Sequence, residues 1–158
     1  MRFLTISLAL VTLAIVPSAG AAPLQREPTG NGSQLGLYAG HGTAIVKSDD
    51  GAILGTIYKG TIIVRDPLRG PRTTVSTSGC KRHRIDSITF SCAGRNISFS
   101  VVNGSWKVTL RGNRLGSRIN ASAVVSGWLR LQGTAGKFAI DNGRKRVWPH
   151  TWRTFVLG

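Results

Sequence analysis

Apolar and polar residues alternate with a period of two along most of the chain after residue 36, a pattern typical of β-strands with one buried face. The clearest case is residues 119–131, where every second residue is apolar or glycine. This stretch predicts one long strand, or two strands with a bend at Ser126-Gly127. Shorter runs predict strands over 44–48, 52–59, 61–66 and 154–157. No window shows the 3.6-residue period of an amphipathic helix.

The strongest turn signal is Asn103-Gly104, because both central positions of a tight hairpin turn need a positive φ that Asn and Gly tolerate. This turn predicts a hairpin in which Ile97, Phe99 and Val101 pair with Leu110, Val108 and Trp106. In that register the apolar residues share one face. A second pair, Asn142-Gly143, predicts another tight turn that puts Phe138 opposite Val147.

These patterns predict an all-β fold: a single antiparallel sandwich or barrel-like domain of about eight short strands. A small β-solenoid is the alternative, because glycine recurs at a nearly regular spacing at Gly42, Gly51 and Gly60. The β domain is expected to cover residues 36–158. Residues 22–35, which are rich in Gly, Pro, Ser and Asn, are expected to form a flexible lead-in.

Residues 1–21 have the pattern of a signal peptide. Arg2 precedes an apolar run from Phe3 to Val16, and Ala19 and Ala21 supply the small residues before a cleavage site at Ala22. The run is too short to span a bilayer, so no transmembrane segment is expected. The predicted location is outside the cell or in the cell envelope.

Cys80 and Cys92 are predicted to form a disulfide, since an exported protein matures in an oxidising compartment. Ile88, Phe90 and Cys92 share a face, so the bond is expected to connect a strand with the loop before it. Closing a loop of about a dozen residues would stabilise the fold by about 3 kcal/mol.

The chain is strongly basic, with 21 Lys and Arg against 6 Asp and Glu. Removal of residues 1–21 would leave a net charge of +14. Such a charge attracts polyanions. The cations expected to bind them form three clusters at turns: Lys81, Arg82 and Arg84 between the cysteines; Arg111, Arg114 and Arg118; and Arg144, Lys145 and Arg146 after the second Asn-Gly pair. The sequence leaves open whether these clusters share one face.

Three tryptophans are candidate stacking residues for the bases or sugars of a bound polymer. Trp148 and Trp152 lie close to the third basic cluster. Trp128 falls on the polar side of its strand, where it is either an exposed platform or is turned into the core by a bulge at Gly127.

No catalytic or metal-binding pattern is present. Only Asp86 lies near another titratable group, His83, and the other carboxylates have positions typical of turns or surface. No serine lies in a G-x-S-x-G motif, and His41, His83 and His150 lack the spacing of metal ligands. We therefore predict no enzymatic activity, no cofactor and no metal, and treat a small hydrolase as the less favoured alternative.

Three segments resemble short exported β-rich proteins of high-GC actinobacteria: residues 55–66, 104–112 and 119–133. Their common feature is strands punctuated by glycine. Those proteins have no established activity, so the resemblance implies a bacterial envelope setting and assigns no functional residue.

The sequence therefore favours a secreted, non-enzymatic module that binds acidic cell-envelope polymers, nucleic acid or other polyanions through its Arg- and Lys-rich turns. The alternative is a structural protein that assembles through exposed β-edges. The oligomeric state and the identity of the ligand are left open.

Overall fold

The computed structural model describes residues 32–66 and 73–158, and within them the fold is all-β, as predicted. The signal peptide and residues 22–31 of the predicted lead-in lie outside the described residues. The eight strands are β1 (Ser33–Tyr58), β2 (Gly60–Arg65), β3 (Thr74–Arg84), β4 (Thr89–Val102), β5 (Trp106–Gly112), β6 (Arg118–Ile140), β7 (Arg146–Val147) and β8 (Arg153–Leu157).

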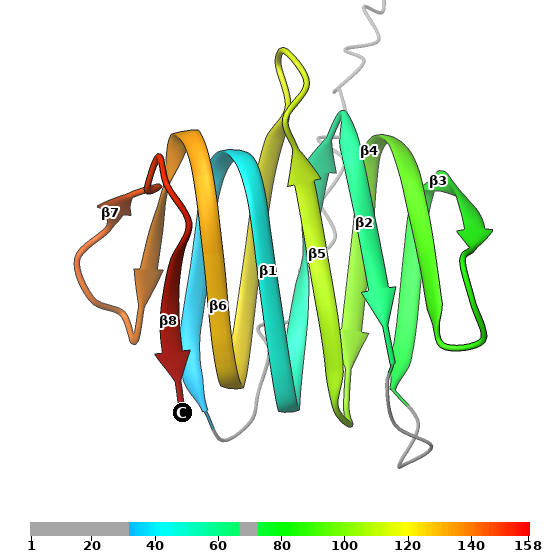
Figure 1. Ribbon diagram of the computed structural model, residues 1–158, viewed down its shortest axis with the longest axis horizontal. Helices are drawn as coiled ribbons and strands as arrows, with labels where there is room; N and C mark the ends of the chain where they lie inside the picture. Colours follow the sequence, from blue (N-terminus) through cyan, green and yellow to red (C-terminus); the bar gives the residue numbers. More distant parts are fainter. Residues whose placement is uncertain (1–31, 67–72) are drawn as a thin grey trace, which may run out of the picture.

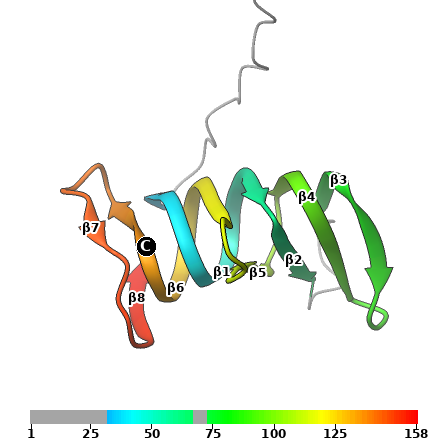
Figure 2. The ribbon, with the colours of Figure 1, turned by 90° about the horizontal axis from the view of Figure 1, so that it is seen from above.

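One antiparallel sheet winds into a flattened barrel of two layers, so the sandwich or barrel prediction is confirmed (Figure 1). The strands β1, β5, β2 and β4 close on themselves, because β1 pairs with β5 over residues 42–48 and with β4 over 52–57. Seen from above, the long strands curve from one layer into the other (Figure 2).

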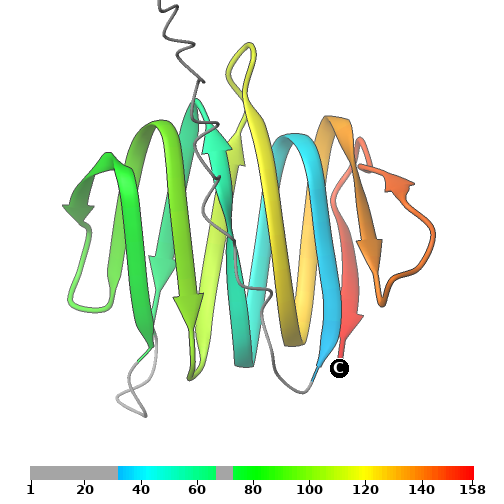
Figure 3. The same ribbon diagram turned by 180° about the vertical axis from the view of Figure 1, so that it is seen from behind.

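The first layer contains β8, residues 127–131 of β6, residues 42–48 of β1, β5, β2, residues 89–94 of β4 and residues 80–84 of β3, in that order. The second layer contains β7, residues 137–140 and 119–125 of β6 on either side of residues 33–38 of β1, then residues 51–57 of β1, 97–102 of β4 and 74–78 of β3. Figures 1 and 3 show these two layers from opposite sides.

Glycines lie where the long strands change layer. Gly51 (φ +154°) and Gly127 (φ +157°) are at one such bend, where residues 48–51 of β1 pair with residues 125–127 of β6. A Cβ on Gly127 would overlap the carbonyl oxygen of Lys47. This confirms the predicted bend at Ser126-Gly127. The glycine spacing that suggested a solenoid has the same cause, because Gly42, Gly51 and Gly60 are each separated by one crossing of a layer, about 30 Å of extended chain.

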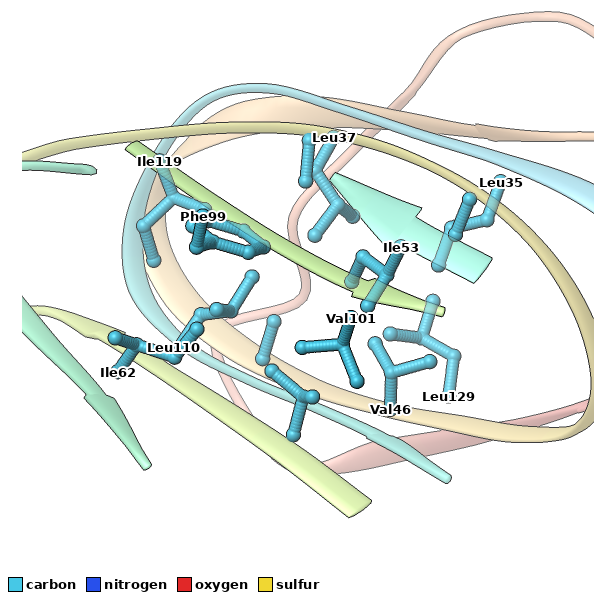
Figure 4. Packing of buried hydrophobic residues seen from close by; sticks show 14 of the residues in the cluster. Leu35, Leu37, Val46, Ile53, Ile62, Phe99, Val101, Leu110, Ile119 and Leu129 are labelled. Carbon is cyan, nitrogen blue, oxygen red and sulfur yellow. The ribbon is translucent and has the colours of Figure 1, made fainter. Parts of the chain in front are cut away.

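The alternating apolar residues meet in one core between the layers. Val46, Leu110 and Leu129 of the first layer are buried against Leu35 and Ile53 of the second (Figure 4). Burial of aliphatic side chains at this density is the main stabilising contribution to the fold, at about 25 cal/mol per Å² of apolar surface.

The predicted hairpin at Asn103-Gly104 has the correct turn and the correct inward faces, but its strand pairing is wrong. Asn103 (φ +66°) and Gly104 (φ +64°) both adopt the predicted positive φ. Residues 97–102 of β4, however, pair with β1 and β3 in the second layer, whereas β5 pairs with β1 and β2 in the first. The predicted partners face each other across the core instead of sharing a hydrogen-bond ladder. An alternating pattern reports which face is buried, and both arrangements bury the same face.

The second predicted turn is shifted by one residue. Its positive-φ positions are Asp141 and Asn142, and Phe138 lies opposite Arg146 instead of Val147. The Asp141 carboxylate accepts hydrogen bonds from the Gln34 amide (2.9 Å) and the Ser33 hydroxyl (3.1 Å) of β1. These bonds fix the turn against β1 and so determine where it lies.

The disulfide between Cys80 and Cys92 is present, with 5.5 Å between the Cα atoms. It connects two neighbouring strands, β3 and β4, and not a strand and a loop as expected. Lys81, Arg82 and Arg84 are therefore strand residues. β1 begins at Ser33, inside the segment assigned to the lead-in, and the predicted closing strand is β8.

Candidate polyanion-binding face

The outward side of the first layer carries a concentration of cations. Residues that pair directly across antiparallel strands project to the same side of a sheet, and the inward residues of this layer, such as Val46, Val108 and Leu129, are buried. Their strand neighbours therefore point outward. The outward cations define the basic face: Lys47 of β1, Arg65 of β2, Lys81 of β3, Lys107 and Arg111 of β5, and Arg130 of β6.

Three cations of the basic face stand side by side on adjacent strands. Lys107 of β5 lies directly opposite Lys47 of β1 on one side and Arg65 of β2 on the other. Neighbouring strands are about 4.8 Å apart, so the row concentrates three positive charges within about 10 Å. Like charges directly opposite each other destabilise a sheet.

The row is only weakly neutralised. In residues 32–66 and 73–158, the single ion pair joins Lys47 Nζ to a carboxylate oxygen of Asp49 at 3.2 Å. Both side chains of this pair are well exposed to solvent, where an ion pair contributes little. Within the described residues, no carboxylate forms an ion pair with Arg65 or Lys107, although the charge of Arg65 contributes to lowering the pKa of Asp86.

Small residues separate further cations of the basic face. Thr61 of β2 lies directly opposite Arg111 of β5 on one side and Ala93 of β4 on the other, and Ala93 lies opposite Lys81 of β3. Because the side chains of Thr61 and Ala93 are short, the surface between Arg111 and Lys81 is low, and we call it the floor.

A hollow of about 580 Å³ opens beside this floor, at the end of the barrel where β1 turns into β2. Three cations, Lys59, Arg95 and Arg114, line it, together with a single exposed apolar side chain, Leu115. We call it the rim hollow; its remaining lining residues are Gly60, Thr61, Ala93 and Gly94. Because Thr61 and Ala93 belong to both, the rim hollow is continuous with the basic face.

The loop that brings Arg114 to the rim hollow is held in place by hydrogen bonds. The Ser117 hydroxyl donates to the Lys59 carbonyl at 2.7 Å, and the Ser117 amide donates to the Arg114 carbonyl at 2.9 Å. His41 Nε2 also lies 3.1 Å from the Arg114 carbonyl oxygen. These hydrogen bonds hold the backbone at Arg114 in place beside the rim hollow.

The outward side of the second layer is different. By the same register its central positions are small or uncharged, including Ser98, Ser100, Ser122, Leu54 and Thr56. Of the described residues, Lys137, Arg118 and Lys145, which lies over the Tyr38 ring, bring positive charge to the margins of this neutral face. The positive charge of the barrel is therefore asymmetric across its two layers.

The three basic clusters expected from the sequence do not converge on one patch. Lys81, Arg111 and Arg114 meet at the basic face and the rim hollow, although they come from two clusters. Arg118 pairs with Tyr58 in the second layer. Arg144, Lys145 and Arg146 lie at the β7 end, the opposite end of the barrel from β3 (Figure 1).

Two of the expected binding residues, Arg82 and Arg84, are engaged within the protein. Arg82 donates to the Thr77 hydroxyl (2.8 Å) and the Val75 carbonyl (3.0 Å) and lies over the Phe90 ring. Arg84 donates to the carbonyls of Asp86 and Ser87. These contacts hold both side chains against the protein at the β3 end of the barrel.

The tryptophans separate into buried and surface residues. Trp148 is 1 % exposed, packs against Gly40 and Gly133 and donates from Nε1 to the Lys137 carbonyl, so it is not available for stacking. Its burial could not be predicted from the sequence, because the space for the ring exists only where Gly40 and Gly133 lack side chains. Trp128 is half-buried on the outward side of β6, so it is not turned into the core. Trp152 is 39 % exposed.

The acidic residues have structural explanations. The pKa of Asp86 is lowered chiefly because its carboxylate accepts a hydrogen bond from the Ile88 amide, at 2.9 Å, in the turn between β3 and β4. Within the described part of the chain, no three His, Cys, Asp or Glu side chains gather as metal ligands would.

Sequence reasoning missed Lys47, Arg65, Lys107 and Arg130 of the basic face and Lys59 and Arg95 of the rim hollow. Each is an isolated cation in its own strand or bend, so none stands out as a cluster. The usable signal was their position: Lys47, Arg65, Lys107 and Arg130 all occupy outward places in an alternating strand.

Comparison of the chain with protein-family models, curated proteins and solved structures finds no match. Over the ranges 32–66 and 73–158 there is no helix with the length and apolarity needed to cross a bilayer. The disulfide is compatible with an extracellular protein.

Proposed function

We propose that this protein is a non-enzymatic, exported module that binds polyanions through the basic face and the rim hollow. The observation that carries the proposal is the row of Lys47, Lys107 and Arg65, which lie side by side on one outward surface and make a single, exposed ion pair within the described residues. Export remains an expectation from residues 1–21, with which the disulfide is compatible.

The energetics of the row support a binding role. Each pair of like charges on adjacent strands costs stability, and a bound polyanion would remove that repulsion. Proteins commonly retain such locally unfavourable arrangements at functional sites. Binding would also release the counterions that condense on the polymer, which makes the affinity depend steeply on salt.

The rim hollow would hold one anionic group of the polymer. Lys59, Arg95 and Arg114 line it from different elements, and Arg supplies two parallel donors to a phosphate or carboxylate. The glycine and alanine floor allows the anion to approach the backbone closely.

The experiment compares two variants that lose the same charge. The face variant carries Lys47→Gln, Arg65→Gln and Lys107→Gln. The control variant carries Lys137→Gln, Arg144→Gln and Lys145→Gln, which lie away from the basic face. Binding to polyphosphate, DNA, an acidic polysaccharide and vesicles that contain phosphatidylglycerol is measured at low salt.

We expect the face variant to lose at least ten-fold in affinity for the bound polymers and the control variant to change less than three-fold. Equal losses would mean that only net charge matters, and no binding by the natural protein at low salt would refute the proposal. Association that depends on protein concentration and is insensitive to salt would favour an assembly role instead.

A further inference from the structure

Two tryptophans border the basic face at its β6–β8 end. Trp128 of β6 lies directly opposite Lys47 on one side and Val156 on the other. Trp152 immediately precedes β8, whose Thr154 lies opposite Arg130. Both indoles therefore lie beside the cations of the basic face, on the same outward surface.

Each of the two rings has a cation over it. The Lys107 ammonium lies 5.9 Å from the centre of the Trp128 ring, and the Arg130 guanidinium lies 4.8 Å from the centre of the Trp152 ring. A planar guanidinium that stacks on an indole provides a second flat surface on which another ring can stack.

We infer that the polymer bound by the basic face is a single-stranded nucleic acid, whose bases stack on Trp152, Trp128 and Arg130 while its phosphates contact Lys47, Lys107 and Arg65. This inference rests on the proposed function and names its ligand class. A charged surface that follows the backbone, combined with aromatic side chains for the bases, is the arrangement used in single-strand recognition.

The geometry favours a single strand over a duplex. The bases of a duplex are stacked on each other and cannot reach a tryptophan on the sheet surface, whereas those of a single strand can turn outward. The row of cations at strand spacing, about 4.8 Å, also suits the dense charge of a phosphodiester chain. Acidic polysaccharides carry fewer charges along their length and are the competing ligand in the test.

The experiment measures the affinities of the natural protein for oligo(dT), for the same length of RNA, for duplex DNA, for polyphosphate of equal charge and for an acidic polysaccharide. Tryptophan fluorescence is recorded in the same titrations. Because Trp106 and Trp148 are fully buried, quenching by a base reports on Trp128 and Trp152.

The variants are Trp152→Leu, Trp128→Leu and the conservative Trp152→Phe. Val156→Ser serves as the control, since it removes an exposed apolar side chain at the same end of the face without removing a ring. Circular dichroism and thermal unfolding establish that each variant folds.

We expect the natural protein to bind oligo(dT) about ten-fold more tightly than polyphosphate of equal charge, with quenched fluorescence. Trp152→Leu should bring this ratio close to one and leave the affinity for polyphosphate unchanged, while Trp152→Phe and Val156→Ser should retain most of the preference. A tighter complex with duplex DNA or with the polysaccharide, or a ratio of one in the natural protein, would overturn the inference while the polyanion proposal stands. Failure to bind any of these polymers would refute the proposal itself.

Discussion

Lys47 of β1 and Lys107 of β5 lie directly opposite each other on the outward side of the first layer. A directly opposed pair of like charges opposes folding, and Arg65 adds a third charge on the far side of Lys107. The surface proposed to bind polyanions is therefore also a surface where the fold can be made more stable.

Lys107→Gln should stabilise the protein. The substitution removes two like-charge contacts at once, which we expect to raise the free energy of unfolding at low salt by about 0.2–1 kcal/mol for each contact. Salt screens exposed charges, so the gain should shrink as the ionic strength rises. Chemical denaturation at two salt concentrations measures both effects. Lys137→Gln, which removes a charge opposite Tyr38 and Val147, should change stability little; an equal gain there would contradict the explanation.

Ala93→Glu should weaken polyanion binding without weakening the fold. Ala93 is an exposed floor residue of the rim hollow, with Lys81 directly opposite and Arg95 and Arg114 lining the same hollow. A carboxylate there would occupy the place of the bound anion, and we expect at least a ten-fold loss of affinity with an unchanged or raised melting temperature. The uncharged Ala93→Gln has nearly the same shape and should bind almost normally. Equal losses in both variants would show that bulk, not charge, is responsible.

Gly40→Ala should destabilise the barrel by about 1–3 kcal/mol, because the added Cβ would overlap the buried Trp148 ring. Equilibrium unfolding measures this loss. Trp148→Phe removes part of the ring and leaves space, so the double variant should lose less stability than the sum of the two single variants. Strict additivity would mean that the two residues do not share this contact.

Replacement of Cys80 and Cys92 by alanine should lower the free energy of unfolding by about 3 kcal/mol, the chain-entropy value for a loop of this length. Reductant should destabilise the natural protein by a similar amount and have no effect on the double variant. A natural protein that unfolds identically with and without reductant would show that the bond contributes nothing.

The faces of the strands could be predicted from the sequence, and their partners could not. Ile97, Phe99, Val101, Trp106 and Leu110 all point inward, as their alternation indicated. Alternation gives no information on whether two consecutive strands share a ladder or face each other across a core. The Asn103-Gly104 turn fits both, so the pairing of β4 with β1 depends on contacts between residues about 45 positions apart in sequence.

The basic face was hidden for a related reason. Lys47, Arg65 and Lys107 are distant in sequence and adjacent only because β1, β5 and β2 are neighbours. The clusters that are visible in the sequence, such as Arg144, Lys145 and Arg146, lie together only locally and are placed at the far end of the barrel. The register of the strands determines which outward side chains lie together on a sheet surface. Local composition gives no information on that register.

The most direct test of a polyanion-binding face is the salt dependence of affinity for the tightest-binding polymer. The logarithm of the association constant is plotted against the logarithm of the salt concentration, with a slope that counts the phosphates neutralised. For the face variant, which lacks the charges of Lys47, Arg65 and Lys107, we expect the slope to be smaller by about two than in the natural protein. The control variant, which lacks those of Lys137, Arg144 and Lys145, should keep the natural slope. Identical slopes in the face and control variants would contradict the assignment of binding to this face.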